Sequence, residues 1–261
     1  MGRRLERRWS LKEATARLGK QQGELPRGPP SDPWSQILWE NVAYLASDEA
    51  RATAFRELEA SVGMAPKAIL DASRDQLRAI GARGILPETS VEKLRECARI
   101  AMDRFGGDPR ALEAMPTEQL RPLVERFPGI GMPSRERILL YARLDPILAL
   151  DSNGLRVLLR LGYGKKESNY ARTYASVRRA LPVSGTEDFD FLIEAHERLR
   201  THGKSLCHRT HPHCSECPLA QRCPSREDLP IAPGARRKMV SPRKSYLKAD
   251  PILMGAETWP S

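Results

Sequence analysis

Four of the five cysteines of this 261-residue chain lie within 17 residues of one another, in the order Cys207-x6-Cys214-x2-Cys217-x5-Cys223. The N-terminal segment is charged and lacks the apolar stretch of a secretory signal, so a disulfide framework is not favoured. Clustered thiols in such a chain are typical of a metal site. We therefore expect Cys207, Cys214, Cys217 and Cys223 to fold as one loop around a metal centre.

Thiolates ligate both zinc and iron–sulfur clusters, so the number of cysteines does not decide between them. Structural zinc sites usually pair two short C-x2-C units across a longer gap, and only one such unit is present. The spacing therefore favours an iron–sulfur cluster. Zinc stays open as an alternative, because three histidines lie inside the loop: His208, His211 and His213.

Apolar residues upstream of the cysteines recur at helical spacing from about residue 32 to 201. Glycine and proline pairs interrupt the amphipathic stretches, and alternating strand patterns are absent. These features predict an all-α fold. Residues 1–31, which are basic and then rich in glycine and proline, predict a flexible arm with one short helix around Ser10–Leu18. Residues 225–261 predict an extended tail. One amphipathic face illustrates the pattern: Trp34, Ile37, Leu38, Val42 and Leu45.

The chain carries a formal net charge of +10 and a sequence pI of about 9.6. This excess favours a polyanionic partner such as DNA, with a merely solvated basic surface as the alternative. No apolar run approaches the roughly 20 residues needed to cross a bilayer. We therefore expect no membrane association and a cytoplasmic, nucleoid-associated protein.

A second motif lies in the middle of the chain, where Phe127-Pro128-Gly129-Ile130-Gly131 predicts a tight turn between two helices. The glycines permit a close approach of the backbone to a ligand. Proline at position 133 suits the first turn of the next helix, whose exposed N–H groups suit a phosphate.

Together, the cysteine loop, the His202-Gly203-Lys204 segment before it and the Pro-Gly-Ile-Gly hairpin resemble the endonuclease III family of helix-hairpin-helix DNA glycosylases. The resemblance implies that the cysteines hold a structural 4Fe–4S cluster. It also implies that the partner is double-stranded DNA containing a lesion or mismatch, bound by a monomer. The residues implied in DNA binding are Gly129, Gly131, Ser134, Lys204, Arg209 and Arg222.

This resemblance spans about residues 32–224 and implies two helical lobes. One is a six-helix barrel, residues 48–142, which ends in the hairpin. The other joins residues 32–47 to residues 143–224 and carries the cluster. The cleft between them would receive a nucleotide extruded from the duplex.

An acidic residue after the hairpin, Asp151, precedes a predicted helix and could simply be its N-cap. Its context, Leu150-Asp151 followed by Arg156-Val157, is similar to that of the superfamily's catalytic aspartate. A carboxylate there would stabilise positive charge on the sugar and orient water. We expect Asp151 to be catalytic, with capping as a compatible second role.

A second candidate acid is Glu40, in the segment Asp32-Pro33-Trp34 through Glu40, which resembles the first core helix of mismatch-adenine glycosylases. In those enzymes a glutamate at this offset protonates the departing base, whereas the alternative here is an exposed surface glutamate. The Gln-Gln-Thr run of those relatives is replaced by Tyr44-Leu45-Ala46.

The chain also departs from the strand-cleaving members of the family. They carry a lysine two residues after the second hairpin glycine, where this sequence has Pro133, and Arg135 replaces a small residue. Proline has no amine for a Schiff base, so we expect a monofunctional glycosylase. The alternatives are a non-catalytic DNA-binding relative and a zinc-stabilised nucleic-acid-binding module.

Overall fold

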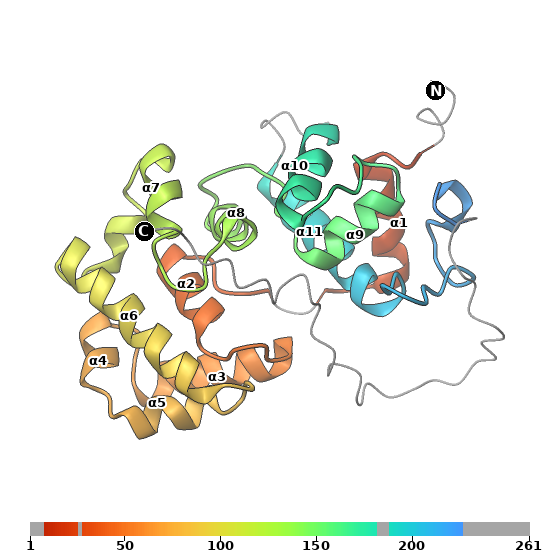
Figure 1. Cartoon of the computed structure of the whole chain (residues 1–261). Coiled ribbons are helices and arrows are strands. Elements are labelled where there is room, and N and C mark those ends of the chain that lie inside the picture. The colour runs from red at the N-terminus through yellow and green to blue at the C-terminus, as the bar shows by residue number, and fades with distance from the viewer. Residues whose placement is uncertain (1–7, 26–27, 182–187, 227–261) are drawn as a thin grey trace.

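The computed structural model describes residues 8–25, 28–181 and 188–226, and Figure 1 shows these ranges as helices joined by loops. They contain eleven α helices, short 3₁₀ turns and no β strand, so the predicted all-α class is confirmed. Within the same ranges no helix is long and apolar enough to cross a membrane. Only residues 225–226 of the expected tail belong to the described part.

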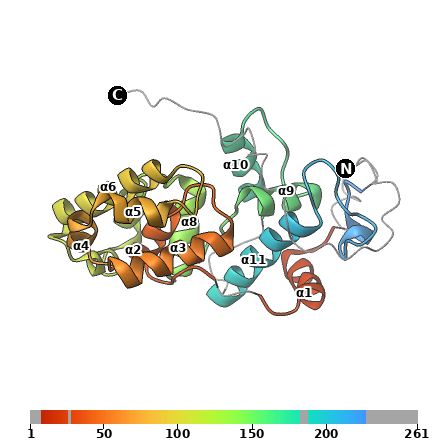
Figure 2. The same cartoon turned by 90° about the horizontal axis from the view of Figure 1, so that it is seen from below.

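The first lobe is formed by the first half of the chain and occupies the left of Figure 1, and Figure 2 shows the same separation from below. A continuous hydrophobic core runs through it from Trp34 to Leu139. The range 48–142 contains six described α helices, and the helix that precedes this range packs in the same core. The helices of this lobe are α2 (Pro33–Asn41), α3 (Asp48–Ser61), α4 (Pro66–Asp71), α5 (Arg74–Gly81), α6 (Pro87–Phe105), α7 (Thr117–Val124) and α8 (Met132–Tyr141).

The second lobe has its own core, which runs from Trp9 to Leu219 and includes one face of each of its helices. Helix α11 packs against both α1 and α9. The loop with the four cysteines follows α11 and closes this lobe. The helices are α1 (Leu11–Gln22), α9 (Ser152–Arg160), α10 (Tyr170–Ala180) and α11 (Phe189–Ser205).

Helix α2 lies in a different lobe from the one expected for residues 32–47. Ile37, Leu38 and Val42 are fully buried in the first core, where α2 packs against α3, α6 and α8. The apolar stripe was correctly recognised from Trp34 to Val42, but its last member, Leu45, lies beyond the end of the helix and is 41% exposed. A stripe also does not identify the surface that covers it. The first core provides that surface, so α2 belongs with the barrel.

Helix α1 includes the short helix expected around Ser10–Leu18, but it packs in the second core and is not part of a flexible arm. Ser10 and Glu13 form a capping box at its start, each side chain bonding the other residue's backbone N–H. Leu11 and Leu18 are buried in the second core, and the Trp9 indole donates to the carbonyl of Leu219 at 2.8 Å. Residues 8–25 are therefore a folded part of the second lobe, whereas residues 1–7 and 26–27 lie outside the described residues.

Candidate active site and cysteine centre

Asp151 is the N-cap of α9, and hydrogen bonds fix both oxygens of its carboxylate. Oδ1 accepts from the backbone N–H of Gly154 at 2.7 Å, and Oδ2 accepts from the side-chain amide of Asn153 at 2.9 Å. Arg200 of α11 brings its Nε to 3.4 Å from Oδ2. Because the Asp151 side chain remains 21% exposed, the capping role does not close it to a ligand.

The surroundings of Asp151 keep its carboxyl group charged. Burial raises its pKa, but the positive charge of Arg200, the neighbouring His196 and the two hydrogen bonds together outweigh that effect. The net result is a pKa below the ordinary value of 3.8. Asp151 is therefore ionised at neutral pH, which is the state that stabilises a developing positive charge.

Glu40 lies near the end of α2 and is paired much more tightly. Its Oε1 forms an ion pair with Arg137 of α8, and the Ser134 hydroxyl donates to Oε2 at 3.3 Å. The Glu40 and Arg137 side chains are only 10% and 14% exposed. Arg137 and Ser134 thus contact both oxygens of a carboxylate that is largely covered from solvent.

The predicted hairpin turn joins α7 to α8. Gly129 has a φ of +73°, and a Cβ there would lie 3.0 Å from Oδ1 of Asn41, so the turn requires glycine. Gly131 is the N-cap of α8, and because it has no side chain, the N–H groups of the first turn receive no side-chain cap. Ser134, the third hairpin candidate for DNA binding, donates instead to Glu40.

One basic residue beside the turn was not anticipated from the sequence. The Lys93 amine of α6 would lie 3.2 Å from a Cβ on Gly129, and it sits 5.0 Å from the centre of the Tyr44 ring. Lys93 is 36 positions from the hairpin in the sequence and lies in an ordinary amphipathic helix. No local pattern could place it there.

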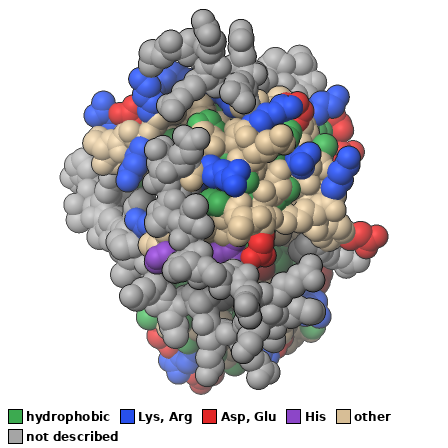
Figure 3. Space-filling model, turned by 90° about the vertical axis from the view of Figure 1, so that its right-hand side faces the viewer, with side chains coloured by type: hydrophobic (Ala, Val, Ile, Leu, Met, Phe, Trp, Pro, Cys, Tyr) green, Lys and Arg blue, Asp and Glu red, His purple; other side chains and the backbone are tan. Residues whose placement is uncertain are grey.

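The other predicted DNA-binding residues are separated from one another. Lys204 lies at the lobe boundary, where its amine is 2.5 Å from a carboxylate oxygen of Asp48. Arg222 stacks over the Trp9 ring at 4.3 Å and pairs with Glu13 at 3.1 Å. Arg209 is exposed in the cysteine loop. Figure 3 shows Lys and Arg side chains distributed over this end of the second lobe.

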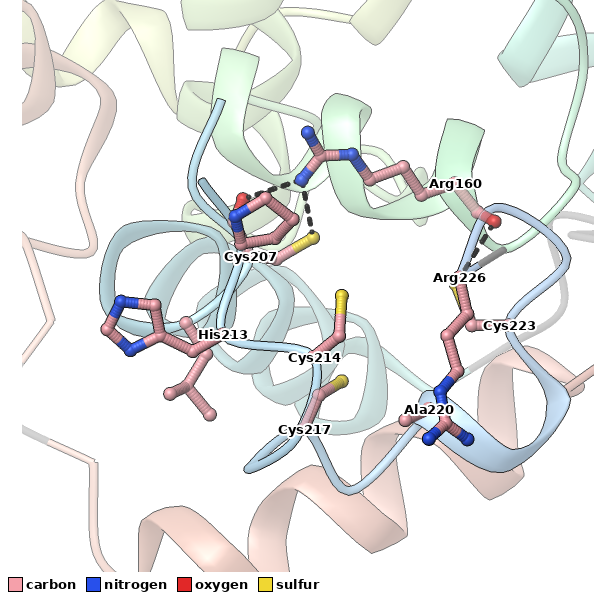
Figure 4. A pocket seen from close by; sticks show the side chains of 10 residues that line it. Arg160, Cys207, His213, Cys214, Cys217, Ala220, Cys223 and Arg226 are labelled. Atoms are coloured by element: carbon pink, nitrogen blue, oxygen red, sulfur yellow. Dashed lines mark hydrogen bonds between the residues drawn. The ribbon is translucent and has the colours of Figure 1, made fainter. Parts of the chain in front are cut away.

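The four loop cysteines come together, as the spacing predicted. None of them forms a disulfide, and all four line one small open cavity. Arg160 of α9 donates to the Cys207 sulfur at 3.1 Å. Figure 4 shows the sulfur atoms of Cys207, Cys214 and Cys217 facing this space, whereas the His213 ring points away from it.

In the described ranges, no group of three or more His, Cys, Asp or Glu side chains is placed to hold one metal ion. The four cysteines line the walls of one cavity. Burial raises the pKa of Cys217 to about 11, so a thiolate there requires a nearby positive centre.

Three charged residues at the lobe boundary were missed at the sequence level: Asp48, Arg137 and Arg200. Arg200 could have been found, because His196, Arg200 and Lys204 are spaced by four residues and share one face of α11. Asp48 could not, since its partner Arg200 is 152 positions away.

Two solved structures share this fold over most of their length. The structure of a thermostable thymine-DNA glycosylase superimposes with a TM-score of 0.64 and 15% identity, covering 84% of this chain and 95% of that one. A trapped endonuclease III–DNA covalent intermediate gives a TM-score of 0.62 and 17% identity, covering 84% and 96%. No protein-family model matches the chain.

Sequence relatives lead to the same group. Thymine-DNA glycosylase of Aeropyrum pernix is 24% identical over 206 residues, 77% of this chain and 86% of that protein. Endonuclease III of Treponema pallidum is 25% identical over 203 residues, 73% and 87%. The transcriptional activator DEMETER of Arabidopsis thaliana is 24% identical over 193 residues, 70% of this chain but 10% of that protein.

Fold, hairpin and relatives together define an all-helical protein of the helix-hairpin-helix class. The chain is similar in sequence and in fold to the endonuclease III superfamily of DNA glycosylases, enzymes that hydrolyse N-glycosyl bonds. The recognition made from the sequence motifs is therefore confirmed.

Proposed function

We propose that this protein is a monofunctional DNA glycosylase of base excision repair, which hydrolyses the N-glycosidic bond of a damaged or mispaired base. The observation that carries the proposal is the Asp151 carboxylate, which is ionised, fixed at both oxygens and 21% exposed. Cleavage of the bond develops positive charge on the sugar, and a fixed carboxylate stabilises that charge. Water adds to the sugar carbon and the base leaves with a proton.

The partner in this proposal is double-stranded DNA, bound by a monomer in the nucleoid. An endonuclease III has been seen in a non-covalent DNA complex, and that structure shares this fold with a TM-score of 0.61. The Gly129–Gly131 turn brings backbone N–H groups to the DNA phosphates, with Lys93 beside it. The target nucleotide then flips out of the duplex to reach Asp151.

The reaction stops at an abasic site because the hairpin position that carries a lysine in the strand-cleaving enzymes is occupied by Pro133. Strand cleavage through a Schiff base requires a primary amine to attack the sugar, and Pro133 supplies none. Helix α8 begins at Met132, so Pro133 lies in its first turn, where proline is well tolerated. A structural role in starting helix α8 is therefore enough to explain proline at position 133.

The cysteine cavity fits a 4Fe–4S cluster held by Cys207, Cys214, Cys217 and Cys223. Four thiols without a disulfide line one space, and the loop contains a single C-x2-C unit, which favours a polynuclear cluster over zinc. When bound, the cluster would crosslink the loop after α11. Arg160 would support it through its contact with the Cys207 sulfur.

For Glu40, the ion pair with Arg137 supports a structural role in joining α2 to α8. The sequence-based prediction that Glu40 protonates the base remains open to experiment. Under this proposal Asp151 carries the chemistry, and Glu40 contributes by fixing the hairpin helix.

The proposal is tested by incubating the purified holoprotein with a panel of duplexes. The panel contains uracil, thymine or adenine mispairs, oxidised guanine, hypoxanthine and alkylated purines, and free base is measured by chromatography. We expect release from at least one duplex. Binding to the duplexes without release from any would instead support a non-catalytic DNA-binding relative. A colourless protein containing zinc would contradict the assigned cluster.

A further inference from the structure

The boundary between the lobes is bridged by charges from α3 and α11. Arg200 donates to both oxygens of Asp48, from Nη1 at 2.8 Å and from Nη2 at 2.5 Å. Lys204 reaches the same carboxylate at 2.5 Å. The Arg200 side chain is only 18% exposed, whereas Asp48 is half exposed. A fork of this kind holds a guanidinium plane in one orientation.

The remaining nitrogen of the same guanidinium faces Asp151. Arg200 Nε lies 3.4 Å from Oδ2, the oxygen that also accepts from Asn153. Arg200 therefore stands between two carboxylates, one from each lobe. Its Nη atoms bind Asp48 and its Nε approaches Asp151.

We propose that Arg200 is a positioning residue that keeps Asp151 ionised and oriented, and that Asp48 acts through it by fixing the guanidinium across the lobe boundary. This inference rests on the proposed glycosylase function for its catalytic consequence. It adds that the charge and orientation of the Asp151 carboxylate depend on the relative position of the two lobes.

The other charged and titratable groups around Asp151 have different partners. Arg137 is paired with Glu40, and Lys204 is paired with Asp48. His196 bonds the carbonyl of Ala149 through Nδ1, and burial lowers its pKa, so it is neutral at neutral pH. In the described part of the chain, four helices carry charged or titratable groups that interact electrostatically with Asp151. They are Arg137 of α8, Arg156 of α9, Tyr170 of α10, and His196, Arg200 and Lys204 of α11.

Arg156 is likewise engaged elsewhere. Its guanidinium donates to the carbonyls of Gly203 and Cys207 and to the side-chain oxygen of Asn153. It thus orients the Asn153 amide toward Asp151 rather than binding the carboxylate. Among the described residues, Arg200 is the cation for which the structure records an ion pair with Asp151.

The first test compares the wild type with Arg200→Gln and Arg200→Lys. We expect the midpoint of the acidic limb of the single-turnover rate to rise by about one to two pH units in Arg200→Gln, with Arg200→Lys in between. The substrate is the panel duplex that the wild type processes fastest. Arg74→Gln is the control, because it removes one arginine whose ion pairs are exposed and remote from Asp151, and it should leave the midpoint unchanged.

The same shift should be visible without any substrate. The Asp151 carboxyl carbon resonance, assigned by its loss in Asp151→Asn, should titrate at higher pH in Arg200→Gln. This readout distinguishes the two proposals, because it holds even if no duplex is processed. An unchanged titration of Asp151 in folded Arg200→Gln would overturn the role of Arg200.

The second test addresses Asp48 through a double-mutant cycle. Asp48→Asn should reduce the plateau rate about fivefold in the wild-type background and have little further effect in Arg200→Gln. The pH titration of the Asp151 carboxyl resonance is measured in the same four proteins: wild type, the two single variants and the double variant. Additive effects of the two substitutions would show that Asp48 does not act through Arg200.

Discussion

The end of α2 and the start of α9 each present a carboxylate beside an arginine, yet the two regions are built differently. At α2, Glu40 is in direct contact with Arg137 and almost fully covered. At α9, Asp151 is held mainly by neutral donors, stays 21% exposed and has its arginine at 3.4 Å. A carboxylate at a lobe boundary is thus suited to act on a substrate when hydrogen bonds hold it in place and leave it accessible.

The largest expected difference between the two regions is in catalysis. Asp151→Asn should reduce the single-turnover rate of base release by about 100-fold or more, because it removes the charge opposite the sugar. Asparagine is as good an N-cap as aspartate, so α9 should remain folded. Glu40→Gln is the matched substitution, and a rate within about tenfold of wild type is expected. Equal losses of rate in Asp151→Asn and Glu40→Gln would show that the two carboxylates contribute equally to catalysis.

In folding stability the order of the two regions should reverse. Glu40→Gln leaves the buried Arg137 without its partner, which should cost about 3–5 kcal/mol of unfolding free energy. Chemical denaturation of both variants measures this. The double substitution Glu40→Leu with Arg137→Met should recover most of the loss, because an apolar pair avoids the buried charge. A Glu40→Gln protein as stable as wild type would contradict the structural role of the pair.

Sequence reasoning located both carboxylates, because each follows a recognisable local pattern. It misplaced α1 and α2 for a common reason: the surfaces that cover them are distant in the chain. Trp9 bonds a carbonyl 210 positions away, and the stripe on α2 fits either lobe in principle. The helical spacing of Arg200 could have marked it as a candidate, but its link to Asp48 in the other lobe could not be predicted from sequence.

The region around α9 should also respond to mild acid. His196 is 2% exposed and neutral, with its pKa below 6.5 because of burial. A depressed pKa contributes stability that is complete above 6.5 and is lost as pH falls toward the folded-state value. We expect the melting temperature to decrease below pH 6.5. His196→Asn keeps a donor near Ala149 but cannot titrate, so its profile should be flatter. A slope unchanged in this variant would assign the effect to another group.

The smallest effect concerns the turn beside α2. Gly129→Ala should destabilise the protein by about 1 kcal/mol or more, since its φ is +73° and the added Cβ would lie 3.0 Å from Asn41. Gly23→Ala is the control, with a φ of +66° and open space around the Cβ. Thermal melts should rank Gly129→Ala below Gly23→Ala. The reverse order would indicate that contact with Asn41 does not constrain the turn.

The central claim is base hydrolysis by Asp151 without strand cleavage, and one gel experiment tests it. The wild type and Asp151→Asn are incubated with an end-labelled duplex from which the wild type releases a base, and each sample is divided before alkali treatment. We predict a strand break for the wild type only after alkali, and none for Asp151→Asn. Breakage without alkali, or equal breakage by both proteins after alkali, would contradict the claim.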